Sequence, residues 1–226
     1  MRLLAFDTSG AALSAAAAQD VAILAARHEA LGRGHAERLL PMLEEVMAAA
    51  AWSWRDLDLV AVTVGPGNFT GLRAGIAAAR ALALALERPV LAVGTLELAA
   101  EAALDPTDTR PIQVILDARR SEVYAQRFSA ALVPLDEPAL LSLDQVFAAW
   151  LPGWRLVGDA VPGLDELWGG HAMIETRLDA RNLVRAAHRR LAGGAEPVAG
   201  TDLRPLYLRP PDARVNAGAS LLAATR

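Results

Sequence analysis

The 226-residue sequence contains no cysteine and no lysine. Without cysteine, the chain cannot form a disulfide framework, a thiol nucleophile or a zinc–thiolate site. All 22 basic residues are arginine, which excludes a Walker-type phosphate lysine, a kinase-type lysine and Schiff-base chemistry. The formal net charge of −4 argues against a large, independent nucleic-acid surface, although it leaves room for a local basic patch.

The sequence also lacks a long apolar run free of charge. The longest candidate, residues 74–86, contains Arg80 and is followed by Glu87. Near the N-terminus, Asp7 interrupts the apolar stretch that a signal peptide would need, so residues 3–6 are predicted to form a buried strand. We therefore expect a cytoplasmic protein with no membrane contact.

Apolar residues make up 54% of the chain, and their spacing predicts an α/β protein with mixed sheets and covering helices. Strands are predicted at 3–6, 12–18, 21–28, 59–64, 90–93, 155–157 and 205–208. Helices are predicted at 35–51, 70–86, 143–150, 180–191 and from about 95. In the helix at 35–51, one apolar face is predicted to hold Leu39, Leu40, Leu43, Val46, Met47 and Ala50.

A weak internal repeat indicates two related lobes. Residues 114–117 and 4–7 are both apolar runs that end in an aspartate, Asp117 and Asp7, before a second strand begins. The polar turn at 105–111 is the expected boundary, giving lobes at 1–104 and 105–226. In this interpretation the two aspartates face each other across a cleft; alternatively, each only caps a turn at the end of its strand.

The richest motif is the string from Gly65 to Gly75, which joins an apolar strand to a helix. Its glycines allow a tight turn, Thr70 is the expected N-cap, and the free amides of the first helical turn offer an anion site. The alternative is a tight connection that binds nothing. The candidate residues for a nucleotide site or a structural turn are Asp7, Thr8, Gly65, Gly67, Thr70 and Gly71.

The string Gly-Pro-Gly-x-Phe-Thr-Gly-Leu-Arg-x-Gly at 65–75 closely resembles a segment of the TsaB (YeaZ) family. Weaker matches follow the family's order at 3–8, 35–42, 117–124 and 206–209. The resemblance implies an actin-like (ASKHA, ribonuclease-H-like) fold. It also implies a noncatalytic subunit that pairs with its catalytic paralogue TsaD. With the ATPase TsaE, this complex transfers a threonylcarbamoyl group to N6 of adenosine 37 in transfer RNA.

The resemblance assigns ATP and metal to the partner subunits, with neither bound by this chain alone. A catalytic relative carries a His-x-x-x-His pair on the helix that starts here at His35, but the fourth residue along is Leu39, so no metal site is expected. One rival is a stand-alone ATPase or kinase that uses Asp7, Thr8 and the 65–71 turn; Arg119 and Arg120 stand where a phosphate loop would favour glycine. A peptidase of the M22 glycoprotease type is a second rival, without an evident nucleophile or metal pair.

The helix at 70–86 is apolar on almost every face, so it must be covered on more than one side. Either the chain's own sheet and the 35–51 helix cover it, or another protein does. On the second interpretation the two helices bind TsaD, or a second copy of the chain. The predicted partner-binding residues are His35, Leu39, Leu43, Thr70, Leu72, Arg73, Gly75, Ala78 and Ala79. A stripe of arginines at 181, 185 and 189 is predicted to be solvated or, alternatively, to contact RNA phosphates.

Overall fold

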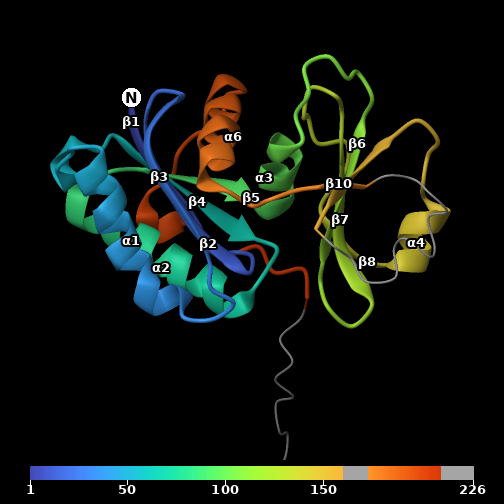
Figure 1. Ribbon diagram of the computed structural model, residues 1–226, viewed down its shortest axis with the longest axis horizontal. Coiled ribbons are helices and arrows are strands. Elements are labelled where there is room, and N and C mark those ends of the chain that lie inside the picture. The colour runs from blue at the N-terminus through green and yellow to red at the C-terminus, as the bar shows by residue number, and fades with distance from the viewer. Residues whose placement is uncertain (160–172, 210–226) are drawn as a thin grey trace, which may run out of the picture.

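The computed structural model describes residues 1–159 and 173–209. Two five-stranded sheets lie side by side, with helices between and outside them (Figure 1). The first sheet consists of β1 (Arg2–Asp7), β2 (Ala12–Gln19), β3 (Ala22–Ala30), β4 (Leu59–Gly65) and β5 (Val90–Gly94). The second consists of β6 (Ile112–Asp117), β7 (Glu122–Phe128), β8 (Ala139–Ser142), β9 (Arg155–Gly158) and β10 (Met173–Glu175).

The two sheets repeat one strand order. In the first, the order is β3-β2-β1-β4-β5: the first three strands are antiparallel neighbours, while β4 runs parallel to β1 and β5 parallel to β4. In the second, β8-β7-β6-β9-β10 has the same directions. The predicted α/β architecture of two related lobes with mixed sheets, as in the actin-like fold, is therefore confirmed.

Helices fill three layers around the sheets (Figure 1). They are α1 (His35–Ala49), α2 (Phe69–Leu86), α3 (Thr95–Ala102), α4 (Leu143–Ala148) and α6 (Ala180–Ala192). Helices α1 and α2 cover one face of the first sheet, and α6 covers the other. Helix α3 packs on the second sheet, whose opposite face is covered by α4.

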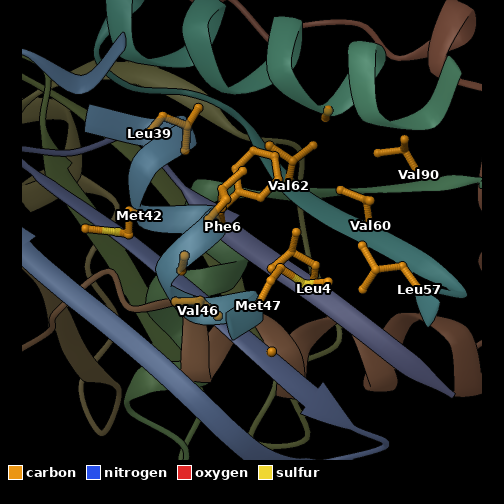
Figure 2. Packing of buried hydrophobic residues seen from close by; sticks show 14 of the residues in the cluster. Leu4, Phe6, Leu39, Met42, Val46, Met47, Leu57, Val60, Val62 and Val90 are labelled. Carbon is orange, nitrogen blue, oxygen red and sulfur yellow. The ribbon is translucent and has the colours of Figure 1, made fainter. Parts of the chain in front are cut away.

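The main core lies between the first sheet and helices α1 and α2. Figure 2 shows Leu39, Met42 and Val46 of α1 close to Phe6 and Val62 of the sheet. Most of the predicted apolar face of α1 is buried there, because the positions three and four apart point to the same side. Leu40 is an exception, since its side chain is 53% exposed and faces away from the sheet.

Two predictions about the second half are wrong. Residues 180–203 do not belong to the second lobe, because α6 packs on the first sheet through Leu183 and Val184, and the Ala180 amide donates to the Ser14 hydroxyl at 2.9 Å. The chain thus returns to the first lobe after β10. Residues 205–208 are not a strand, because they have no regular secondary structure and lie outside both sheets.

Within the described ranges, α2 alone is long and apolar enough to cross a membrane by length and composition. It is longer than the predicted apolar run because it starts at Phe69 and includes Arg73. One face of α2, with Leu72, Ile76 and Ala79, is buried against the first sheet. The apolar character of this face is therefore explained by packing within the folded chain.

Candidate functional site

Asp7 ends β1 and is fully buried at the turn that follows. Its Oδ1 accepts hydrogen bonds from the Ser9 amide at 3.0 Å, the Ser9 hydroxyl at 2.6 Å and the Thr63 hydroxyl at 2.5 Å. Burial raises the pKa of Asp7 above its ordinary value, although these hydrogen bonds oppose the rise. Through Oδ1, the carboxylate therefore stabilises a turn within the first lobe. Its other oxygen, Oδ2, is buried and has no hydrogen-bond partner among the described residues.

The glycines inside α2 allow the helix to touch the turn after Asp7. A β-carbon at Gly71 would collide with the Thr8 carbonyl oxygen, and one at Gly75 would collide with the Thr8 hydroxyl. Both glycines are buried. Their role in the fold is close approach between the helix and the Asp7–Ser9 turn, and this role requires no bound ligand.

The glycines before α2 have a similar explanation. Gly67 lies against the Ser9 carbonyl, and Gly65, with φ of +117°, lies against the carbonyl of Leu206. The Asn68 amide also donates to the Ser9 carbonyl at 2.7 Å. The string at 65–75 thus lies against two other segments at backbone distance, so its glycine content by itself does not indicate a phosphate site.

The N-cap of α2 is Asn68 and not Thr70. The Asn68 side chain accepts a hydrogen bond from the Gly71 amide at 3.0 Å, as an N-cap residue does. Thr70 lies within the first turn of the helix and is exposed. Both residue types are good caps, and asparagine directly after Gly67 was the signal that could have identified the true one.

The second lobe carries the matching turn after Asp117. Arg119, Arg120 and Ser121 all have left-handed backbone conformations, with φ of 65°, 59° and 60°. The Arg119 amide donates to Asp117 at 2.7 Å, and the Asp117 amide donates to Asp159 at 2.8 Å. Burial raises the pKa of Asp159 above its ordinary value.

A cleft of about 520 Å³ separates the two turns. Its walls include Ser9, Gly67 and Thr70 from the first lobe, with Asp117 and Arg119 from the second. Asp117 lines this cleft, whereas Asp7 is buried beneath it, so the prediction that two aspartates face each other across the cleft is wrong. The combination of carboxylates, arginines and the N-terminus of α2 is chemically able to accept a small anion with a cation.

Residues 1–159 and 173–209 contain no group of three or more histidine, aspartate or glutamate side chains that could hold a metal ion. His35 begins α1 and is 6% exposed, with its Nε2 lacking a hydrogen-bond partner among the described residues. Leu39, one turn later, is part of the core and contributes no ligand atom.

Most of the predicted partner-binding residues lie inside the chain. Leu39, Leu43, Leu72 and Ala79 are core residues, and His35 and Gly75 are also buried, so none of the six presents a contact surface. Thr70 and Arg73 are exposed, and Ala78 is half-buried. Any partner that binds these helices must do so through their outer faces.

The outer face of α2 carries a row of exposed apolar residues next to two exposed arginines, Arg73 and Arg80. The exposed apolar residues beyond Arg73 are Ala77, Ala81, Leu84 and Ala85. Leu84 is the most exposed large apolar side chain in the described residues, at 80%, and Leu40 of α1 is also exposed. The sequence signal for this face was the apolar character of α2 on all sides, since the sheet can cover only one of them.

The arginines of α6 are not a free stripe. Arg189 pairs with the buried Glu101 of α3 at 2.9 Å, and Arg190 pairs with Glu97 at 2.8 Å. Arg185 lies 3.7 Å from the same Glu101 carboxylate, and Arg181 pairs with Asp179. These arginines join α6 to α3 and to its own N-cap. Arg181 and Arg185 are also exposed, in line with the predicted solvated face, and contact with RNA phosphates stays a prediction.

Comparison with known proteins identifies the family. The family model described as "TsaD: tRNA N6-adenosine threonylcarbamoyltransferase" matches residues 27–150. The solved structure of YeaZ from Pseudomonas aeruginosa superposes with a TM-score of 0.81 and 30% identity, covering 92% of this chain and 99% of that one. The chain belongs to the TsaB (YeaZ) family.

Curated relatives agree with this membership of the TsaB family. The tRNA threonylcarbamoyladenosine biosynthesis protein TsaB of Escherichia coli (strain K12) is 38% identical over 124 residues. That match covers 55% of this chain and 53% of the E. coli protein, so the chain spans about half the length of this curated relative. Protein Rv3421c of Mycobacterium tuberculosis is 36% identical over 94% of this chain and 93% of its own length. The family is thus one that takes part in tRNA threonylcarbamoyladenosine biosynthesis.

Proposed function

We propose that this chain is a noncatalytic subunit in the synthesis of threonylcarbamoyladenosine at position 37 of transfer RNA. In this role it binds a TsaD paralogue, which performs the transfer, and the TsaE ATPase completes the complex. ATP and metal belong to those partners, and transfer RNA meets this chain only within the complex. The proposed site of action is accordingly the cytoplasm.

The observation that carries the proposal is the row of uncovered apolar residues on the outer face of α2, which Arg80 borders. Ala77, Ala81 and Leu84 lie at intervals of three to four residues, so they form one row along the helix. Small side chains let a second helix approach closely, while Leu84 supplies an apolar side chain for it to bury. An exposed row of this kind is typical of a protein interface.

Two further observations favour a noncatalytic role. The oxygen Oδ1 of Asp7 is taken up by hydrogen bonds within the turn. The glycines at 65–75 are accounted for by backbone contacts. In an ATP site, the Asp7 carboxylate and the glycine turn would be the groups that the first lobe offers to the nucleotide and its metal.

A charge on the proposed interface tests the proposal. Ala81→Glu places a carboxylate on the outer face of α2 without disturbing the core, because Ala81 is exposed. We expect its affinity for the TsaD paralogue to fall by about 30-fold or more, which corresponds to about 2 kcal/mol. Transfer of threonylcarbamoyl to tRNA should fall in parallel when the variant is not in excess.

The matched control is Ala22→Glu, at an exposed alanine in β3 far along the chain from α2. It should bind the paralogue with the affinity of the parent chain. Full transfer activity without this chain would refute the proposal. Turnover of substrate by the isolated chain would refute its noncatalytic part.

The stand-alone ATPase or kinase remains the second candidate because the cleft between the lobes contains Asp117, Asp159 and Arg119. Calorimetry with ATP and magnesium on the isolated chain separates the two. Tight, magnesium-dependent binding would favour the ATPase, whereas its absence favours the partner subunit. Sedimentation of the isolated chain, with Ala81→Glu as the variant, tests self-association through the same face.

A further inference from the structure

Residues 203–209, here called the strap, run between the two lobes in the red-orange part of Figure 1. The first half of the strap is fixed to the first lobe. Leu203 is buried in the main core, and its carbonyl accepts a hydrogen bond from Arg80 of α2 at 2.5 Å. The Leu206 amide donates to the Val64 carbonyl at the end of β4, at 2.7 Å.

Tyr207, in the middle of the strap, packs on the N-terminal end of α2. Its ring lies 5.2 Å from that of Phe69, and its hydroxyl accepts a hydrogen bond from Arg73 at 3.2 Å. The Arg73 guanidinium also lies 3.8 Å from the Phe69 ring centroid. The three side chains form one exposed cluster at the edge of the outer face of α2.

The last two residues of the strap are fixed to the second lobe. Leu208 packs against the core between α3 and the second sheet. The Nη2 group of Arg209 donates to the Ala118 carbonyl at 2.8 Å, to the Arg119 carbonyl at 3.3 Å and to the Glu122 carboxylate at 2.7 Å. Arg209 thus links both ends of the turn that follows Asp117.

This turn needs such support. Its three consecutive left-handed residues are not glycines, and each such conformation costs about 1 kcal/mol or more. A strained conformation persists only where surrounding contacts hold it. Within the lobe, the Ala118 amide donates to the Glu122 carbonyl and the Glu122 amide donates to the Arg119 carbonyl. Arg209 adds contacts from the strap, which is anchored to the core of the first lobe through Leu203.

We propose that the strap fixes the angle between the lobes and holds the turn at 118–121, with Tyr207 and Arg209 as its positioning residues. The strap also connects that turn to the end of α2 that carries Phe69 and Arg73. A protein bound to the outer face of α2 is therefore coupled to the second-lobe turn; this last clause rests on the proposed function. It gives a physical role to Pro205-Leu-Tyr-Leu-Arg209, which the fold alone does not explain.

The angle can be measured on the full chain. Because the chain has no cysteine, Val21→Cys and Leu135→Cys place one spin label in each lobe at exposed positions. The distance between the two labels, measured by double electron–electron resonance, should have a narrow distribution in the doubly labelled parent chain. Arg209→Ala and Tyr207→Ala should each broaden or shift the distribution. Hydrogen exchange of the amides at 118–121 should become about tenfold faster or more in Arg209→Ala.

The matched control is Arg204→Ala. Arg204 lies in the same segment, but among the described residues its hydrogen bonds reach the nearby Thr201 and Leu203 carbonyls and not the second lobe. Tyr207→Phe, which keeps the ring and removes the hydroxyl, should give an effect between that of the parent and that of Tyr207→Ala. An unchanged distribution in Arg209→Ala would overturn the proposal, as would an equal broadening in Arg204→Ala. If the circular dichroism of an alanine variant shows that it has lost its helices, the distance distribution of Tyr207→Phe alone decides whether the strap fixes the lobe angle.

A second measurement tests the coupling. Adding the TsaD paralogue should slow exchange at 118–121 in the parent chain, and this protection should be lost in Arg209→Ala while the affinity stays within about twofold. If the parent binds but gains no protection, the coupling is wrong. If the parent does not bind the paralogue, the proposed function is wrong, while the distance measurement on the isolated chain still decides the role of the strap.

Discussion

The two lobes share one strand order, yet they finish their first strand in different ways. In the first lobe, Asp7 is buried under the N-terminal end of α2, and Gly71 and Gly75 bring the helix against the turn. In the second lobe, Asp117 is partly exposed and its turn, with Arg119 and Arg120, faces the cleft.

The covering helices differ as well. Between the third and fourth strands of each sheet, the first lobe has α1 with 15 residues, whereas the second has α4 with only six. The first lobe therefore has two long helices on one face of its sheet, and under the proposed function a partner binds their outer sides. The contrast is that the first-lobe turn is packed under a long helix, whereas the second-lobe turn lies open to the cleft.

Among the tests of this contrast, Gly71→Ala has the largest expected effect on stability. The new methyl group would meet the Thr8 carbonyl, which belongs to the backbone and cannot rotate away. We expect the free energy of unfolding, measured by urea denaturation, to fall by about 3 kcal/mol.

Gly193→Ala is the control for this substitution. At Gly193 the backbone φ is −80°, and the nearest atoms to an added β-carbon are at 3.4 Å. The control should change the free energy of unfolding by less than about 1 kcal/mol in either direction. Equal stability of Gly71→Ala and the parent would mean that α2 does not approach the Asp7 turn as described.

The second test concerns the buried carboxyl of the first lobe. Burial raises the folded-state pKa of Asp7 above the unfolded value of 3.8. Between these two pKa values the folded chain holds more protons than the unfolded chain, so stability should fall as the pH rises through this range and then level off. In Asp7→Asn this decrease should be absent, so the variant gains stability relative to the parent as the pH rises.

Thr63→Val sharpens the same measurement. The Thr63 hydroxyl donates to the Asp7 carboxylate and lowers its pKa, so removing it should extend the decrease in stability to higher pH. The free energy of unfolding would be measured by urea denaturation at several pH values from about 4 to 8. Exposed carboxylates titrate at about pH 4, so they affect the pH dependence least at the upper end of this range. Parallel curves for Asp7→Asn and the parent would contradict the assignment.

Much of this architecture could be predicted from the sequence, because apolar spacing reports which face of an element is buried. The two aspartate turns revealed the repeat, and the small residues of α2 revealed a helix with neighbours on several sides. The inward residues Leu39 and Leu72 were assigned to the partner surface because a helical wheel does not say which apolar face the chain itself covers. Leu40 is the reverse case, because it was predicted on the same apolar face as Leu39 but is exposed.

Other features depend on contacts far apart in the sequence. Nothing in residues 180–191 says that α6 returns to the first sheet, since either sheet offers an apolar face. The pairing of Arg189 with Glu101 follows from that return, and charge patterning along one helix cannot reveal it. The role of Gly65 was equally hidden, because its close neighbour, Leu206, comes from the strap.

The substitution with the smallest expected effect tests the strain in the second-lobe turn. Arg119→Gly replaces a residue with φ of +65° by one that adopts this conformation freely. The relief of strain exceeds the added entropy of the unfolded chain, so we expect a gain in the free energy of unfolding of about 0.5 kcal/mol. The lost ion pair with Asp117 contributes little, since the two charged atoms are 3.7 Å apart and the Arg119 side chain is 86% exposed.

The control is Arg88→Gly, at an exposed arginine outside the left-handed region. Its free energy of unfolding should instead fall by about the same amount. Equal losses at both positions would show that the turn at 119–121 is not strained in solution.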